Sequence, residues 1–256
     1  MRIATWNVNS LKARLPRVEG WLEQRQPDVL LMQETKLSDA AAPEMPFRMA
    51  GYELAHHGEG RWNGVAICAR QPITDVSYGF EGNGPDDDGA RFLAVRVAGI
   101  RCISIYAPNG RSLNDPMYAA KLGWYERLAM WLEQHADPAE PLVLGGDLNI
   151  APTDLDVYDP AAYVGTTHTS APERAAFQRL LDWGLEDAYR QSHSEGGRFT
   201  WWDYRAGNFH KGLGMRIDHL LVTAPIAARL RGAEIDRDAR KGSLPSDHAP
   251  LWIDLD

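Results

Sequence analysis

Polar side chains that can bind a metal or move a proton follow the ends of six apolar, strand-like segments of this 256-residue chain. In chain order they are Asn7 and Asn9, Glu34, Tyr106 and Asn109, Asp147 and Asn149, Asp218 and His219, and Asp247 and His248. Oxygen ligands of this kind favour Mg²⁺, Mn²⁺ or Ca²⁺ over zinc or copper. Because Mg²⁺ held by one or two carboxylates commonly accompanies phosphate chemistry, the set indicates a metal-assisted reaction of a phosphoester.

Each of these positions, taken alone, also has an ordinary structural interpretation. Asp and Asn after a strand form turns and caps, and for any single position that role is the more frequent one. Asp147 and Asn149 carry more weight, because residues two apart on an extended segment point the same way. The chemical interpretation therefore depends on a fold that brings the six segments together.

The pattern of apolar residues predicts the elements that would position these groups. Helices are predicted at about residues 16–24, with Pro16 at the first helical position, and at 117–135 and 173–183. Strands are predicted at 2–8, 28–33, 52–56, 65–69, 92–97, 103–107, 141–145, 199–202, 217–222 and 251–255, and loops at 79–89 and 150–172. Strands alternate with helices, yet several strands follow one another directly. We therefore expect an α/β domain of mixed sheets with helices outside, spanning residues 1–256 without a linker.

Composition excludes several classes of protein. With 44% hydrophobic and 24% charged residues, the chain is neither disordered, collagen-like nor a coiled coil. The net charge of −8 and pI near 5.5 argue against adhesion to nucleic acid or anionic membrane through the overall field. Cys68 and Cys102 lie in apolar segments without zinc spacing, so we expect two buried free thiols. No signal peptide or membrane span is expected, which favours the cytoplasm.

Six blocks, read in order, resemble a known family. ATWNVNSLKAR, LLMQETK, SIYAPNG, VLGGDLNIAPTD, MRIDHLL and PSDHAPLWIDL resemble the exonuclease III family of apurinic/apyrimidinic (AP) endonucleases, within the endonuclease/exonuclease/phosphatase superfamily. The resemblance covers essentially the whole chain. It implies a four-layered α/β sandwich, with two mixed β-sheets packed face to face and helices outside. It also implies a monomeric, Mg²⁺-dependent DNA repair nuclease in which Mn²⁺ substitutes for Mg²⁺.

The implied substrate is double-stranded DNA. The enzyme would cleave 5′ to abasic sites and remove nucleotides or blocking groups from 3′ ends. In this resemblance Glu34 is the principal metal-binding carboxylate, and Asn7 is a ligand or a residue that positions one. Asp147 would orient or deprotonate the attacking water, and Asn149 would hold the phosphate or the nucleophile. If a second cation binds, its further contacts would come from Asp147, Asn149, Asp247 and His248.

Four more residues receive roles from the same resemblance. His248 would hydrogen-bond a phosphate oxygen, and Asp218 would fix its tautomer and raise its basicity, as in other carboxylate–histidine pairs. Tyr106 would offer its phenol to the pentacovalent phosphorane or to the leaving oxygen, and Asn109 would donate to a DNA phosphate. The sequence departs from the family pattern at Leu244 and Ser10, where Lys and Gly are more usual, and neither position belongs to this set.

Contacts to DNA are expected from residues around these blocks. Trp201 and Met215 resemble residues that line the pocket for an abasic sugar, although Trp201 has the alternative of an ordinary strand residue. Arg111 and Lys211 flank recognised blocks and would contact the backbone. The basic run at 229–241 is interpreted as a solvated surface and the acidic residues 86–88 as a solvated turn. His168 is interpreted as a surface histidine, with an approach to the DNA as its alternative.

Two alternatives to a repair nuclease remain. Another branch of the superfamily acts on small or lipid phosphates, and a catalytically inactive protein of this fold would serve as a DNA-binding scaffold. A clustered, self-repelling set of carboxylates argues against the scaffold, because a binding protein does not need it. Four acids of the proposed site, Glu34, Asp147, Asp218 and Asp247, contribute to the charge of −8 and would face a cation. We therefore expect DNA binding to depend on the metal and a local basic rim, with a shallow salt dependence.

Overall fold

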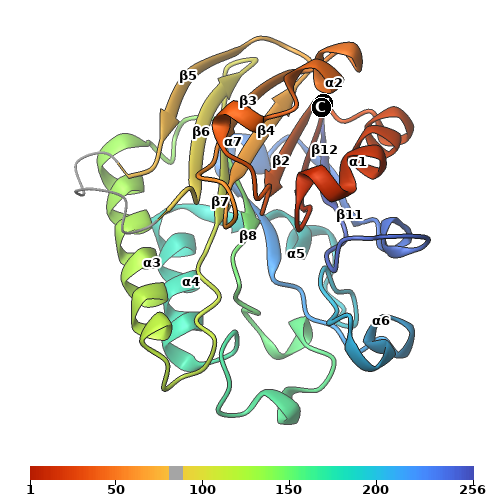
Figure 1. The fold of residues 1–256 in the computed structure, drawn as a ribbon. Coiled ribbons are helices and arrows are strands. Elements are labelled where there is room, and N and C mark those ends of the chain that lie inside the picture. The colour runs from red at the N-terminus through yellow and green to blue at the C-terminus, as the bar shows by residue number, and fades with distance from the viewer. Residues whose placement is uncertain (81–88) are drawn as a thin grey trace.

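Two six-stranded sheets form the centre of the molecule in the computed structural model, which describes residues 1–80 and 89–256 (Figure 1). The first sheet has the order β11-β12-β1-β2-β4-β3 and the second β5-β6-β7-β8-β10-β9. In the first sheet the strands are β1 (Arg2–Asn7), β2 (Val29–Gln33), β3 (Glu53–His57), β4 (Val65–Ala69), β11 (Leu230–Ile235) and β12 (Leu251–Leu255). In the second they are β5 (Ile73–Tyr78), β6 (Phe92–Val97), β7 (Ile100–Tyr106), β8 (Leu142–Asp147), β9 (Leu185–Asp187) and β10 (Asp218–Thr223).

Each sheet has a parallel pair of strands at its centre, β1 with β2 and β7 with β8, and antiparallel strands on both sides. Parallel neighbours need a crossover connection, which is usually helical. The crossovers here are α1 (Leu11–Arg25) and α3 (Pro116–His135). The remaining helices are α2 (Glu44–Met49), α4 (Ala171–Trp183), α5 (Ala188–Ser192), α6 (Asn208–Lys211) and α7 (Ala224–Ala227), with 3₁₀ turns at Asp39–Ala41, Asp154–Asp156, Pro160–Tyr163, Arg205–Gly207 and Arg237–Arg240.

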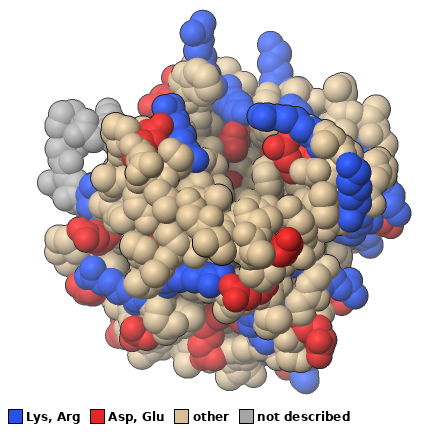
Figure 2. Space-filling view, turned by 90° about the horizontal axis from the view of Figure 1, so that it is seen from below, with Lys and Arg blue, Asp and Glu red and all other residues tan. Residues whose placement is uncertain are grey.

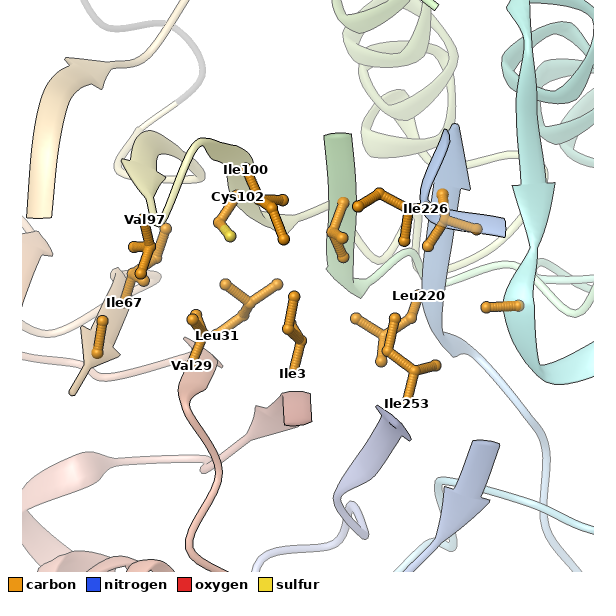
Figure 3. Close-up of a cluster of buried hydrophobic side chains, with 14 of the residues drawn as sticks. Ile3, Val29, Leu31, Ile67, Val97, Ile100, Cys102, Leu220, Ile226 and Ile253 are labelled. Carbon is orange, nitrogen blue, oxygen red and sulfur yellow. The ribbon is translucent and has the colours of Figure 1, made fainter. Parts of the chain in front are cut away.

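The main apolar core lies between the two sheets. Ile3, Leu31 and Ile253 of the first sheet face Cys102 and Leu220 of the second (Figure 3). A second cluster packs α3 and α4 against the outer face of the second sheet, and a third packs α1 and α2 against the first. The four layers confirm the predicted α/β sandwich. Cys68 and Cys102 are buried free thiols, as expected, and burial raises the pKa of both.

The first helix begins earlier than predicted. The expectation that Pro16 occupies the first helical position is wrong, because α1 begins at Leu11 and contains Pro16. An internal proline removes one backbone hydrogen bond. The buried face formed by Leu11, Val18, Trp21 and Leu22 packs against the sheet, and this burial outweighs the lost bond.

Predictions also differ from the structure at the sheet edges and at one aromatic segment. Residues 199–202 form no strand, and Trp201 makes only isolated bridges to Met215 and His248. The edge strands β5, β9 and β11 were not predicted; β5 is largely exposed and β11 contains a glycine and two charged residues. The basic run at 229–241 therefore contains a strand, and Arg240 in it is buried. The acidic residues 86–88 lie outside the described residues.

A buried ionic network links the ends of several elements of the second sheet. Arg216 Nε lies 2.7 Å from Asp156 Oδ1, and Arg216 Nη2 lies 2.8 Å from Asp187 Oδ2. Burial alone raises the pKa of each carboxyl, but the charge of Arg216 outweighs it, so the pKa of both Asp156 and Asp187 lies below the usual value. A lowered carboxyl pKa contributes stability above the unfolded pKa of about 3.9, and this contribution is lost as the pH falls through the folded pKa.

Replacing Asp187 by Asn should therefore lower stability at neutral pH and weaken its acid dependence. Asn can still accept the N-cap hydrogen bonds that Asp187 accepts from the backbone N–H groups of Tyr189 and Arg190. It removes one of the two negative charges that compensate the buried positive charge of Arg216. We expect the free energy of unfolding at pH 7 to fall by about 3–5 kcal/mol, and the loss between pH 5 and pH 2 to become smaller. Urea unfolding between pH 2 and pH 7 measures both the free energy of unfolding at neutral pH and its decrease in acid. The exposed variant Asp238→Asn should leave both unchanged, and an equal effect of the two variants would contradict the prediction.

Candidate active site

Sheet topology brings the predicted residues to one end of the sandwich. Asn7 ends β1 and Tyr106 and Asp147 end the paired strands β7 and β8, where they lie opposite each other in register. Asp218 begins β10, which runs antiparallel to β8, and it also lies opposite Asp147. His248 precedes β12 at the same end, because β12 runs antiparallel to β1. Residues from both sheets therefore meet at this end.

Asn7 joins the two carboxylates from different sheets. Its Nδ2 donates to Glu34 Oε1 and to Asp147 Oδ2, each at 2.9 Å, while its Oδ1 accepts from the backbone N–H of Asn9 at 3.0 Å. Asn7 is fully buried, and its bond to Asp147 is buried as well, whereas the bonds with Glu34 and Asn9 are only partly buried. Asn7 thus bridges Glu34 and Asp147 through its amide nitrogen.

His248 lies between two carboxylates. Its Nδ1 is 2.7 Å from Asp218 Oδ2, and its Nε2 is 3.7 Å from Asp147 Oδ2. Burial alone lowers the pKa of His248, but the charges of Asp218 and Asp147 outweigh it and raise the pKa to about 10. Burial raises the pKa of Asp147 to about 7, with the charges of Asp218 and Glu34 adding to it against the attraction of His248.

Three ligand atoms, one each from Glu34, Asp147 and His248, lie within 4.8 Å of one another in the described part of the chain. The two carboxylates of this group suit a hard divalent cation. Asp247 is not a member of this group. Its Oδ1 accepts from Asn9 Nδ2 at 2.9 Å, and its Oδ2 accepts from the indole Nε1 of Trp201 at 3.1 Å.

The two asparagines predicted to contact phosphate lie side by side. Asn109 Nδ2 donates to Asn149 Oδ1 at 3.2 Å, and Asn149 Nδ2 donates to the carbonyl of Ala107 at 2.9 Å. The backbone N–H of Asn149 donates to Asp147 Oδ1 at 3.0 Å. The Asp147–Asn149 segment is thus held as one unit at the end of β8.

Tyr106 lies beside the carboxylates with its ring against a cation. The guanidinium carbon of Arg91 is 4.7 Å from the centre of the ring. Burial, followed by the charges of Glu34 and Asp147, raises the pKa of Tyr106 well above its usual value. The phenol is therefore protonated at neutral pH and can donate a hydrogen bond.

Lys36 is a site residue that the sequence analysis did not single out. Its Nζ lies 2.9 Å from Glu34 Oε2 and donates to Asn9 Oδ1 at 2.6 Å. Glu34 and Lys36 both have positive φ, at 51° and 55°, a conformation that persists only where the surroundings hold it. The signal was present in the QETK block, where a lysine stands two residues after the predicted ligand.

Residues expected to contact DNA differ in exposure. The side chain of Arg111 is 70% exposed and Lys211 is exposed at the end of α6, whereas Met215 is buried against Val157 and Ile217. Figure 2, which looks onto the end of the molecule that carries the 150–170 loop, shows a hollow with Lys and Arg side chains along much of its rim. A local basic rim on an acidic protein is compatible with a polyanionic ligand.

His168 differs from its expectation. It is partly buried, with φ of 77°, and its Nδ1 lies 2.7 Å from the carbonyl oxygen of Asn149. Burial, with a contribution from the charge of Lys121, lowers the pKa of His168 to about 4, so the ring is neutral at pH 7 and donates to this carbonyl. The expected surface histidine is therefore a neighbour of the site.

Comparisons with known proteins agree with this arrangement. The model of the Endonuclease/Exonuclease/phosphatase family matches residues 4–248. The chain belongs to this family. Exodeoxyribonuclease III of Haemophilus influenzae is 34% identical over 100% of both chains.

Two solved structures of other proteins are similar to this protein over its whole length. A 3′ phosphatase from Neisseria (NExo), bound to a product DNA hairpin, is 42% identical with a TM-score of 0.97 over 100% of this chain and 99% of the other. An AP endonuclease from Archaeoglobus fulgidus is 36% identical, with the same TM-score and the same coverage. These findings confirm the exonuclease III/AP endonuclease family and the hydrolytic nuclease expected from the six sequence blocks.

Proposed function

We propose that this repair nuclease hydrolyses phosphoesters at 3′ ends of double-stranded DNA, with Mg²⁺ as cofactor, and also cleaves 5′ to abasic sites. The observation that carries the proposal is the group formed by Glu34, Asp147 and His248, next to Asn109 and Asn149. The 3′-end activity is supported by the Neisseria 3′ phosphatase at 42% identity, and abasic-site cleavage by the Archaeoglobus AP endonuclease at 36%. The proposal includes the monomeric, cytoplasmic enzyme expected from the sequence.

The donor set fits a hard divalent cation. Glu34 and Asp147 would hold Mg²⁺ or Mn²⁺, and Asn7 would keep their oxygens together. When bound, the cation would neutralise charge on the phosphate and on the leaving oxygen. No soft sulfur ligand belongs to the group, which agrees with an oxygen-preferring metal. As an alternative to the hydrogen-bonding role of His248, a second cation would draw its contacts from Asp147, Asn149, Asp247 and a neutral His248, and this alternative remains part of the proposal.

Hydrolysis then requires a positioned water, an electrostatic cradle and a protonated leaving group. Asp147 would orient the attacking water and accept its proton. Asn149 and the protonated His248 would donate hydrogen bonds to the phosphate oxygens as negative charge builds up on them. Asp218 would keep the His248 ring oriented. The protonated Tyr106 phenol would donate a hydrogen bond to the pentacovalent phosphorane or to the leaving oxygen.

Two labelled duplexes test the proposal, one with a nick that bears a 3′-phosphate and one with an abasic analogue. In Mg²⁺ we expect phosphate release from the first and nicking of the second. Mn²⁺ should support both reactions, and EDTA should abolish them. Denaturing gels and phosphate release measure the products.

Each alternative outcome of this experiment has a meaning. Undiminished turnover in EDTA would contradict the metal site. Activity on the 3′-phosphate without nicking at the abasic analogue would remove abasic-site cleavage from the proposal. Release of phosphate from a lipid or inositol phosphate, with both duplexes intact, would assign the chain to another branch of the superfamily.

A further inference from the structure

A buried ion pair lies beneath the candidate active site. Lys121 of α3 and Glu173 of α4 are both fully buried, and Lys121 Nζ lies 2.5 Å from Glu173 Oε1. Removing two charges from water is costly, and apolar residues of similar volume often replace such a pair without loss of stability. Stability alone therefore does not explain a charged pair at this position.

The ammonium of Lys121 also binds the backbone of the site. Its Nζ donates to the carbonyl oxygen of Asn149 at 2.6 Å and to that of Asn109 at 3.3 Å. Asn109 follows β7 and Asn149 follows β8, and their side chains are hydrogen-bonded to each other. One buried cation thus holds both of the strand-end segments that carry these asparagines.

Glu173 connects the same carbonyl to the start of α4. Its Oε1 accepts from Thr167 Oγ1 at 2.7 Å and from His168 N at 2.9 Å, and its Oε2 accepts from Ser170 Oγ at 2.6 Å. His168 in turn lies 2.7 Å from the carbonyl oxygen of Asn149. Both members of the ion pair therefore act on Asn149, Lys121 directly and Glu173 through the turn that precedes α4.

The backbone at this point needs such support. Asn149 has φ of 52°, in the left-handed region, which Asn adopts more readily than other non-glycine residues but still at a cost that its surroundings must offset. The packing is also tight, because a Cβ added at Gly110 would lie 3.0 Å from both Lys121 Cδ and Thr167 Oγ1. A small displacement of Lys121 would therefore be transmitted to the Asn109–Gly110 segment, and through the hydrogen bond between the side chains of Asn109 and Asn149 to Asn149.

We propose that Lys121 and Glu173 are positioning residues for phosphoester hydrolysis, which fix Asn149 in the orientation that meets the reacting phosphate. This inference rests on the proposed function, because it takes Asn149 as a contact of the substrate. The pair acts through the carbonyl oxygen of Asn149, and the hydrogen bonds of Lys121 go to Asn149, Asn109 and Glu173 and not to Glu34 or Asp147. Misplacement of a reacting or binding group by about 1 Å can lower a rate about 100-fold.

Kinetics with three variants test the inference on the duplex with a 3′-phosphate. Lys121→Met removes the ammonium but keeps the length of the side chain, and Lys121→Met/Glu173→Gln also removes the uncompensated carboxylate. Leu132→Ala is the control, because Leu132 is buried in the same helix and belongs to the core cluster of the second sheet. We expect kcat to fall about 10- to 100-fold in both Lys121 variants, with KM within about 3-fold of wild type. Leu132→Ala should lower the melting temperature and leave kcat within about 2-fold.

A double-mutant cycle separates positioning from general loosening of the structure. If Lys121 acts through Asn149, then Lys121→Met should cost less than about 2-fold in kcat once Asn149 has been replaced by Ala. Full additivity of the two changes would overturn the inference. So would a kcat of the Lys121→Met/Glu173→Gln variant that falls no further than that of Leu132→Ala.

Hydrogen exchange gives a measurement that needs no substrate. Backbone amides of residues 107–111 and 147–151 should exchange at least about 10-fold faster in both Lys121 variants, and at the wild-type rate in Leu132→Ala. Unchanged exchange in these segments would overturn the inference whether or not the chain cleaves DNA. Wild-type protein without turnover of either duplex would instead overturn the proposed function, so the two failures are distinguishable.

Discussion

Replacing Asp147 by Asn is expected to lower kcat on both duplexes about 10²- to 10⁴-fold, with little change in stability. Asn has the same shape but cannot accept a proton from the attacking water. It also removes one of the negative charges that surround His248 and face Glu34. Burial of a carboxylate among like charges is unfavourable in the free protein, so its loss should not destabilise the fold.

Steady-state kinetics and thermal unfolding of the Asp147→Asn variant measure the two effects. Asp182→Asn is a matched control, because Asp182 lies on the partly exposed face of α4 and pairs with Gln178. That control should keep wild-type kcat. A kcat for Asp147→Asn within 10-fold of wild type would show that another group activates the water.

The chemistry-bearing residues could be predicted from the sequence because most of them lie at the end of an apolar strand, as Asn7, Glu34, Tyr106 and Asp147 do, whereas Asp218 and His248 lie at or before the start of one. β1, β2, β7 and β8 are buried over almost their whole length, and buried strands produce apolar runs that are easily recognised. The ordered blocks then implied the fold. The edge strands β5 and β11 could not be predicted, since an exposed strand need not be apolar.

Site residues whose position depends on tertiary contacts could not be predicted from the sequence for a different reason. Lys121 lies on a helix whose sequence gives no sign that its ammonium would be fully buried. Its burial depends on Glu173, 52 residues later, and on two carbonyl groups that the fold brings to it. The burial of His168 and the contacts of Lys36 with the site could not be predicted for the same reason, because loop residues acquire their partners only through the packing of distant segments.

The His248–Asp218 pair should behave as one functional unit. His248→Asn removes a donor aimed at the phosphate and is expected to lower kcat about 10²- to 10³-fold. Asp218→Asn keeps the shape of the side chain but removes the charge that holds His248 Nδ1 at 2.7 Å. Since Asp218 acts through the His248 ring, we expect Asp218→Asn to lower kcat by most of the factor by which His248→Asn lowers it.

Non-additivity is the measurement that decides whether Asp218 acts through His248. The double variant His248→Asn/Asp218→Asn should have a kcat within about 3-fold of His248→Asn alone, because the second change then removes nothing that still contributes. Asp254→Asn is a suitable control, since Asp254 pairs with Arg2 at a partly exposed position on β12 and should leave kcat unchanged. If the two single losses multiply in the double variant, Asp218 acts independently of the ring, and its role as the partner of His248 would have to be abandoned.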